Sequence, residues 1–144
     1  MQKSIHLDIN AEPEMVFNAL SDLRNYPLWL SFIHKVESTD LDESWLITLR
    51  SQIGPFSRLK KLRMQRTLNP STRSVLFHRD ELDGKQHSNW LLHVRVDEEK
   101  NTRCLITLEL EYSGKFWSKT LENILDSEVI KASKLLEDYL KVQE

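Results

Sequence analysis

Residues 114–141 read GKFWSKTLENILDSEVIKASKLLEDYLK, and this stretch decides the fold because it predicts one long amphipathic helix. Gly114 breaks the preceding strand pattern, and Ser113 or Ser118 is suited to capping the start of the helix. The apolar side chains recur at helical spacing and share one stripe: Trp117, Leu121, Ile124, Leu125, Ala132, Leu135, Leu136 and Tyr139. A helix with one apolar stripe must bury it against another element, and the preceding sequence predicts a sheet.

Glu128 interrupts this stripe. At about 100° per residue it projects between Leu121 and Ala132, near the middle of the apolar face. An unpaired carboxylate in a dry core is very unfavourable, so the position needs an explanation. Either the helix is lifted off the sheet there and Glu128 reaches water or a neighbouring hydroxyl, or Glu128 lines an internal cavity. In the second case it meets a polar group of a ligand or a buried Arg or His.

The chain upstream of this helix predicts mostly β structure. Ser4 to Asn10 alternates like a half-buried strand, Ala11-Glu12-Pro13-Glu14 opens a short helix, and a second short helix covers Leu23 to Leu30, interrupted by Pro27. Further strands are predicted at residues 32–38, 45–50, 58–68, 73–79, 88–96 and 103–112, with a hairpin signal at Asp83-Gly84. The order predicts an α+β fold. A curved antiparallel sheet of about seven strands has two short helices after its first strand and the long C-terminal helix across its concave face.

Length and composition favour an ordinary globular chain. The 144 residues are expected to form one domain, residues 1–144, with 40% hydrophobic and 29% charged side chains. A net charge of −2 gives no global attraction to nucleic acid or to an anionic membrane. Cys104 is the single cysteine and alternates with apolar neighbours, which predicts a small core residue. No signal peptide or membrane span is apparent, so we expect a cytoplasmic location without integral membrane association.

Three local patterns carry a family resemblance. Residues 9–17, INAEPEMVF, resemble a strand followed by Ala-x-Pro-x-x-Val-aromatic, and residues 22–29, DLRNYPLW, resemble Asp-x-x-x-Tyr-Pro-x-Trp. Leu68-Asn69-Pro70 resembles the turn after a long middle strand. These patterns and the element order resemble the START-like, or SRPBCC, superfamily with its helix-grip fold, and most of all its bacterial polyketide cyclase/dehydrase and lipid-transport group. The resemblance implies the fold more strongly than the function, since the superfamily includes lipid carriers, cyclases, hormone receptors and quinone-binding proteins.

The sequence assigns no metal, nucleotide or other cofactor. None of the five histidines forms a metal-binding pair such as HxxxH or HExxH, so structural roles are expected for them. The three glycines lie at predicted turns rather than in a phosphate-binding loop, and no nucleophile signature is present. Glu128 is the one candidate for an acid or base, and no catalytic residue is assigned.

A basic run, Arg58, Lys60, Lys61, Arg63 and Arg66, stands out on the long middle strand. It predicts either a solvated outer face or a patch for an acidic partner or membrane headgroups. Arg66 has the same strand parity as Leu62 and Met64, which makes it a possible partner for Glu128 inside a cavity.

The tryptophans lie on the apolar sides of their elements, where they form the core or border a ligand cavity. The residues expected around such a cavity, with Arg66 and Glu128 as its polar members, are Trp29, Trp45, Leu49, Met64, Arg66, Phe77, Trp90, Leu92, Leu108, Trp117, Ile124 and Glu128.

These features favour binding or transport of a small hydrophobic or amphipathic molecule, such as a lipid, polyketide or quinone, between the sheet and the C-terminal helix. The first alternative is a polyketide cyclase/dehydrase-type enzyme that uses Glu128. The second is a module that binds another protein through the short helices or the basic strand.

Overall fold

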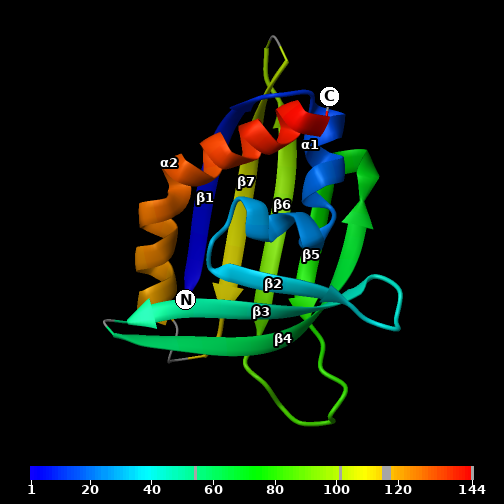
Figure 1. Ribbon diagram of the computed structural model, residues 1–144. Coiled ribbons are helices and arrows are strands. Elements are labelled where there is room, and N and C mark those ends of the chain that lie inside the picture. Colours follow the sequence, from blue (N-terminus) through cyan, green and yellow to red (C-terminus); the bar gives the residue numbers. More distant parts are fainter. Residues whose placement is uncertain (54, 101, 115–117, 144) are drawn as a thin grey trace.

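The structure is a computed structural model, and its described residues are 1–53, 55–100, 102–114 and 118–143. Seven strands form one antiparallel sheet in the order β1-β7-β6-β5-β4-β3-β2 (Figure 1). The strands are β1 (Gln2–Asn10), β2 (Ile33–Ser38), β3 (Ser44–Ile53), β4 (Phe56–Asn69), β5 (Ser74–Arg79), β6 (Trp90–Glu98) and β7 (Arg103–Tyr112). Six strands therefore follow one another as a meander, and β1 joins its far edge, where Ile5 lies opposite Leu108. This confirms the predicted fold class.

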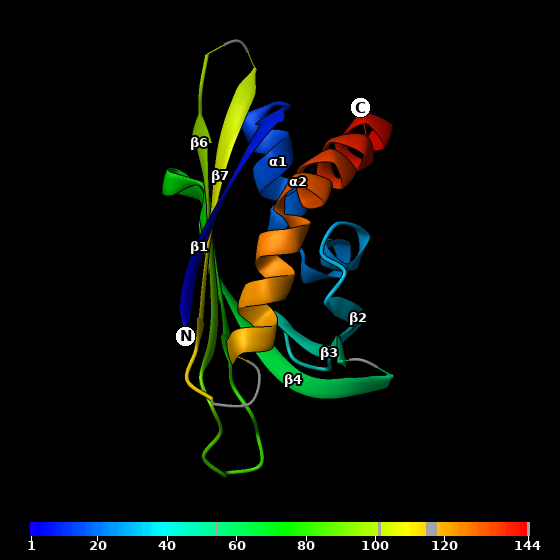
Figure 2. The same cartoon turned by 90° about the vertical axis from the view of Figure 1, so that its left-hand side faces the viewer.

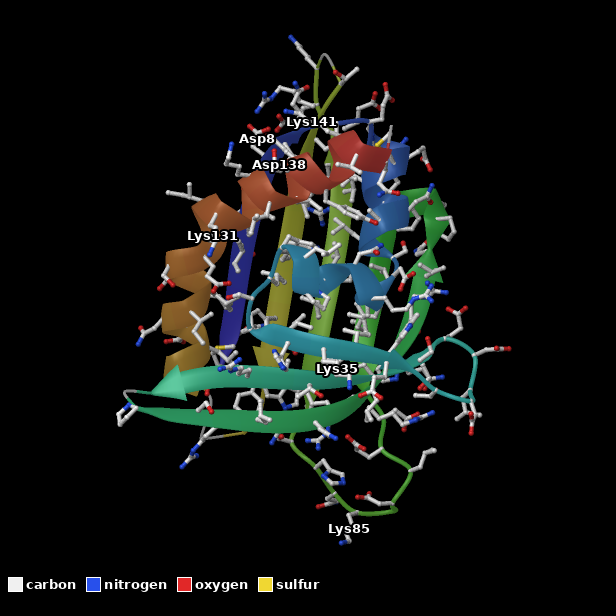
Figure 3. The ribbon with its side chains drawn as sticks, in the orientation of Figure 1. Asp8, Lys35, Lys85, Lys131, Asp138 and Lys141 are labelled. Carbon is white, nitrogen blue, oxygen red and sulfur yellow. The ribbon has the colours of Figure 1, made fainter. Side chains whose placement is uncertain are left out.

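The helices gather on one face of this sheet. They are α1 (Pro13–Leu20), η1 (Leu23–Leu28) and α2 (Ser118–Gln143), with a further short turn, η2 (Pro70–Thr72), between β4 and β5. Figure 2 shows the sheet edge-on, with α1, η1 and α2 on its concave side and β3 and β4 curling beneath them. Charged side chains lie around the outside, for example Lys85 beyond β5 and Asp138 and Lys141 near the end of α2 (Figure 3).

Local sequence explains the two short helices. Pro13 lies in the first turn of α1, and the helix buries Val16, Phe17 and Leu20. Asp22 caps η1, because its side chain accepts a hydrogen bond from the backbone N–H of Arg24 at 3.0 Å. This turn presents its aromatic side chains to the sheet.

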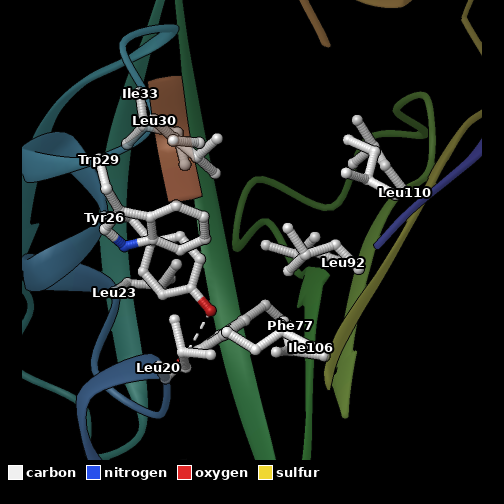
Figure 4. Packing of buried hydrophobic residues seen from close by; sticks show 14 of the residues in the cluster. Leu20, Leu23, Tyr26, Trp29, Leu30, Ile33, Phe77, Leu92, Ile106 and Leu110 are labelled. Carbon is white, nitrogen blue, oxygen red and sulfur yellow. Dashed lines mark hydrogen bonds between the residues drawn. The ribbon is translucent and has the colours of Figure 1, made fainter. Parts of the chain in front are cut away.

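The core lies between η1 and the floor of the sheet. Tyr26 and Trp29 have ring centroids 4.9 Å apart, and Tyr26 meets Phe77 of β5 edge to face at 5.8 Å. The hydroxyl of Tyr26 donates to the carbonyl of Leu20 at 2.8 Å, which satisfies a buried polar group (Figure 4). Cys104 is fully buried as predicted, donates to the carbonyl of Ala11, and has its pKa raised to about 11 by burial.

Two predictions about local sequence need correction. Leu135 is 37% exposed, whereas Leu136 and Leu140 are buried, so the apolar stripe of α2 passes beside Leu135. Asp83-Gly84 does connect two antiparallel paired strands, β5 and β6, but it lies in a loop of residues 80–89 and not in a two-residue turn, and Gly84 has the positive φ of 71° that favours glycine. Trp117 lies outside the described residues.

Arg63 is also not part of a solvated face. It is 8% exposed, and its Nη1 donates to the carbonyl of Asp80 at 2.5 Å. The loop that follows β5 covers this arginine, which strand parity alone does not reveal.

Candidate functional site

Glu128 lies where three hollows meet along the seam between α2 and the η1–β2 link. An open groove of about 430 Å³ is lined by Ser31, Phe32, His34, Arg50, Ser51, Ile124 and Glu128. A wholly apolar hollow of about 10 Å³ is lined by Ile5, Leu7, Leu30, Leu108, Leu125, Glu128, Val129 and Ala132. A crevice of about 40 Å³ between η1 and α2 is lined by Pro27, Leu28, Trp29, Ser31, Glu128, Lys131, Ala132 and Leu135. Glu128 is the side chain common to all three.

The carboxylate of Glu128 is tied to Ser31 in the link between η1 and β2. It accepts hydrogen bonds from the backbone N–H of Ser31 at 3.3 Å and from the Ser31 hydroxyl. A neighbouring hydroxyl is one of the two explanations that the sequence allows for an acid on this face. The position at the junction of the hollows is the other, because the same side chain borders both the polar groove and the apolar space.

Arg66 does not pair with Glu128. Its Nε and Nη2 donate to the two carboxylate oxygens of Glu43 at 2.6 and 2.7 Å, and its Nη1 donates to the carbonyl of Ser21 at 2.7 Å. The guanidinium also lies over the ring of Trp45, with Cζ 5.0 Å from the centroid. These hydrogen bonds lower the pKa of Glu43 below its ordinary value. Arg66 therefore joins β4 to the β2–β3 turn and to the end of α1.

Polarity falls from the open groove to the adjoining apolar hollow. His34 and Arg50 are exposed side chains at the mouth, and Ser31 and Ser51 add hydroxyls. Phe32 and Ile124 give the groove apolar walls, and the adjoining hollow is lined by leucines of three separate elements. Such a gradient suits a molecule with one polar end and one apolar end.

Four of the residues predicted around a cavity line these hollows: Trp29, Leu108, Ile124 and Glu128. Trp45, Leu49, Met64, Phe77, Trp90 and Leu92 are buried, and none of them lines the three described hollows. The prediction for Trp117 falls outside the described residues.

Sequence reasoning missed Ser31, Phe32, His34, Arg50 and Ser51. Arg50 follows Leu49 on β3, so simple alternation places it away from the apolar side chains. The strands curl toward α2 at this end of the sheet, and the curl brings Arg50 and Ser51 to the groove. No local pattern marks a serine such as Ser31 as the partner of an acid nearly a hundred residues away.

Two buried indole N–H groups are left without a partner among the described residues, those of Trp29 and Trp90. Trp29 is 1% exposed and lines the crevice that Glu128 also borders. An unsatisfied buried donor is unfavourable, so this N–H stands out among the polar groups near the site.

A curled antiparallel sheet that grips one long helix, with an amphipathic seam between them, defines the helix-grip class of START-like proteins. The chain belongs to the polyketide cyclase/dehydrase and lipid transport family, whose family model matches residues 9–127. The predicted resemblance is thereby confirmed. A comparison with curated proteins finds no match.

Solved structures with the same fold cover almost the whole chain. TTHA0849 from Thermus thermophilus superposes with a TM-score of 0.74 and 14% identity, over 100% of this chain and 99% of that one. A START superfamily protein from Mycobacterium smegmatis superposes with a TM-score of 0.67 and 14% identity, over 99% of each chain. The Zhui aromatase/cyclase from Streptomyces sp. R1128 superposes with a TM-score of 0.66 and 12% identity, over 98% of this chain and 93% of that one. At these identities the likeness shows the fold alone. Within the described residues, no helix has the length and apolar character needed to cross a bilayer.

Proposed function

We propose that the chain binds or carries a small hydrophobic or amphipathic molecule, such as a lipid, polyketide or quinone, between its sheet and α2. The observation that carries this proposal is the position of Glu128, shared by an open polar groove and a wholly apolar hollow. The polar end of the ligand lies at Glu128 and Arg50, and its apolar part lies beneath α2 against Leu30, Leu108 and Leu125. The family supports a ligand-binding role, and the polarity gradient supports an amphipathic ligand.

Binding requires the seam to open. The apolar hollow of about 10 Å³ has room for roughly one water molecule, so an acyl chain must displace side chains or lift the first half of α2. Opening breaks the hydrogen bonds between Ser31 and Glu128, each a charge-assisted contact of about 1.5–3 kcal/mol. Burying a chain of roughly ten methylenes contributes about 8 kcal/mol, at about 0.8 kcal/mol each. This burial exceeds the loss of the Ser31–Glu128 hydrogen bonds taken alone, and a polar group of the ligand replaces Ser31 at the carboxylate.

Native mass spectrometry of protein freshly purified from its own host tests the carrier proposal. We expect a bound small molecule that dissociates in organic solvent. A fluorescent long-chain amphiphile then measures affinity for Glu128→Ala and for a control, Glu122→Ala, on the exposed side of the same helix. The first substitution is expected to change affinity at least several-fold and the control to leave it unchanged. Absence of a bound molecule together with no probe binding contradicts the proposal.

A second candidate is an enzyme of the cyclase/dehydrase type, and the exposure of Glu128 to a groove that also contains His34 favours it. Here the groove holds a flexible substrate in a reactive conformation, and Glu128 transfers a proton. Glu128→Gln separates the two functions. Unchanged ligand affinity with lost turnover of a poly-β-ketone substrate supports the enzyme, whereas no turnover by the unmodified protein supports the carrier.

A further inference from the structure

The distribution of charge along the chain is strongly uneven. Between Glu43 and Asp80 there are eight Arg and Lys residues and no Asp or Glu. The whole chain has a net charge of −2, so the cations of this segment are offset only by acids from other parts of the sequence. The structure shows which of the eight find such an acid.

Four of these cations are paired. Arg66 binds Glu43 at 2.6 Å, Arg73 binds Glu14 at 2.7 Å, Arg79 binds Glu81 at 3.0 Å and Arg63 lies 3.7 Å from Asp80. The other four, Arg50, Arg58, Lys60 and Lys61, form no ion pair with any described residue. They lie close together along the β3–β4 hairpin, but on both of its faces: the register pairs Arg50 with Leu59 and Ser51 with Arg58, so Arg50, Leu59 and Lys61 share one face and Arg58 and Lys60 share the other.

We name these four cations together with Leu59 the cationic arm. Arg50, Arg58 and Lys61 are exposed, and Leu59, which shares a face with Arg50 and Lys61, is 62% exposed. The arm occupies the end of the β3–β4 hairpin, which in Figure 1 projects past the first turns of α2. This end of the hairpin therefore carries cations on both of its faces, with an exposed apolar side chain beside Arg50 and Lys61.

We propose that the cationic arm docks the protein onto an anionic lipid bilayer. Clustered unpaired cations with an exposed apolar side chain among them match a surface of negative headgroups over hydrocarbon. The negative net charge of the whole chain does not oppose this, because interactions are screened beyond about 8 Å at physiological ionic strength. Each cation close to such a surface strengthens binding about five-fold.

Docking in this orientation also places the groove at the membrane. Arg50 belongs to the arm and lines the groove beside Ser51, Ile124 and Glu128. A bilayer held by the arm therefore lies next to the mouth of the groove. The docking inference goes beyond ligand binding, and its test needs no ligand.

Co-sedimentation with vesicles tests the arm directly. Phosphatidylcholine vesicles with about one third phosphatidylglycerol are compared with vesicles of phosphatidylcholine alone, at low and high salt. We expect binding only to the anionic vesicles, with its loss at about 0.5 M salt. The variant Arg58→Glu/Lys61→Glu is expected to reduce the partition coefficient more than ten-fold.

The control is Lys134→Glu/Lys141→Glu, which makes the same change in formal charge at two exposed positions of α2. It is expected to change the partition coefficient less than two-fold, and circular dichroism checks that both variants fold.

Leu59→Asn keeps every charge and is expected to weaken vesicle binding while the salt dependence is retained. Equal losses in the arm and control variants overturn the proposal. Equal binding to neutral vesicles overturns it too, as does binding of single-stranded RNA in place of vesicles.

Discussion

At the scale of single residues, the half-buried charges of this protein connect elements that are distant in sequence. Arg66 reaches from β4 to Glu43 and to the carbonyl of Ser21, and Glu128 reaches from α2 to Ser31. The sequence marked both residues as unusual because each has the parity of apolar neighbours. It did not identify their partners, since an Arg and a Glu of matching parity suggest an ion pair with each other. Contacts between loops and strands are set by how the sheet curls, and periodicity does not report that.

The pair of Arg66 and Glu43 makes stability depend on acid. Arg66 lowers the pKa of Glu43 below 4.5, so the carboxylate stabilises the folded state above that pH and loses this contribution as the pH falls through its folded pKa. Glu43→Gln removes the pair at all pH values. We expect it to lower the free energy of unfolding by about 0.5–1 kcal/mol at pH 7, because Glu43 is largely exposed, and by less at pH 3.

Urea denaturation of the unmodified protein and the variant at pH 7 and pH 3 measures this difference. Glu122→Gln, at an exposed position of α2, is the control and is expected to change the free energy of unfolding by less than about 0.5 kcal/mol. A Glu43→Gln effect that is as large at pH 3 as at pH 7 contradicts the assignment.

At the scale of elements, α2 was the best-predicted part of the chain, and its errors are instructive. Helical spacing gave Leu121, Leu125, Ala132 and Leu136 correctly as buried residues. It also placed Leu135 on the stripe, but α2 packs mainly against β1, and the direction of that contact favours Leu136 and Leu140. A stripe about 100° wide does not define which of two adjacent leucines lies at its edge.

Adjacent leucines give a matched test of this arrangement. Leu136→Ala leaves a cavity at a fully buried position and is expected to cost about 2–5 kcal/mol in the free energy of unfolding. Leu135→Ala, at a position that is 37% exposed, is expected to cost less than about 1 kcal/mol. Chemical denaturation of both variants measures the difference, and similar losses contradict the described orientation of α2.

At the scale of the whole molecule, the order of the elements could be predicted from the sequence. The residues that line the site could be predicted only in part. Alternating strands and one terminal helix predict a curled sheet with a helix across it, because few other arrangements bury both apolar faces. The predicted cavity residues were chosen by the same parity rule that selects the core, and most of them are core residues, for example Phe77 and Leu49. The described hollows lie instead along α2, where it meets the η1–β2 link and strands from both ends of the sheet, and no single pattern covers all of these elements.

The proposed opening of this seam predicts uneven mobility along α2. Toward its end, Leu136 and Leu140 are buried and Tyr139 and Leu140 lie beside α1, whereas around Glu128 the helix borders hollows. We expect amide hydrogens of residues 121–128 to exchange faster than those of residues 132–140 in the ligand-free protein. A bound amphiphile is expected to slow exchange in the first group most. Hydrogen exchange followed by mass spectrometry measures both, and uniform exchange along the helix contradicts a seam that opens at Glu128.

The pairing of β1 with β7 has a consequence for synthesis on the ribosome. Ile5 leaves the exit tunnel long before Leu108, its neighbour in the sheet, has been translated. At about 5–20 residues per second, the nascent β1 waits roughly 5–20 s with its apolar side chains uncovered. Chaperones that bind extended apolar segments therefore have a window at this strand, which closes only when the last strand emerges.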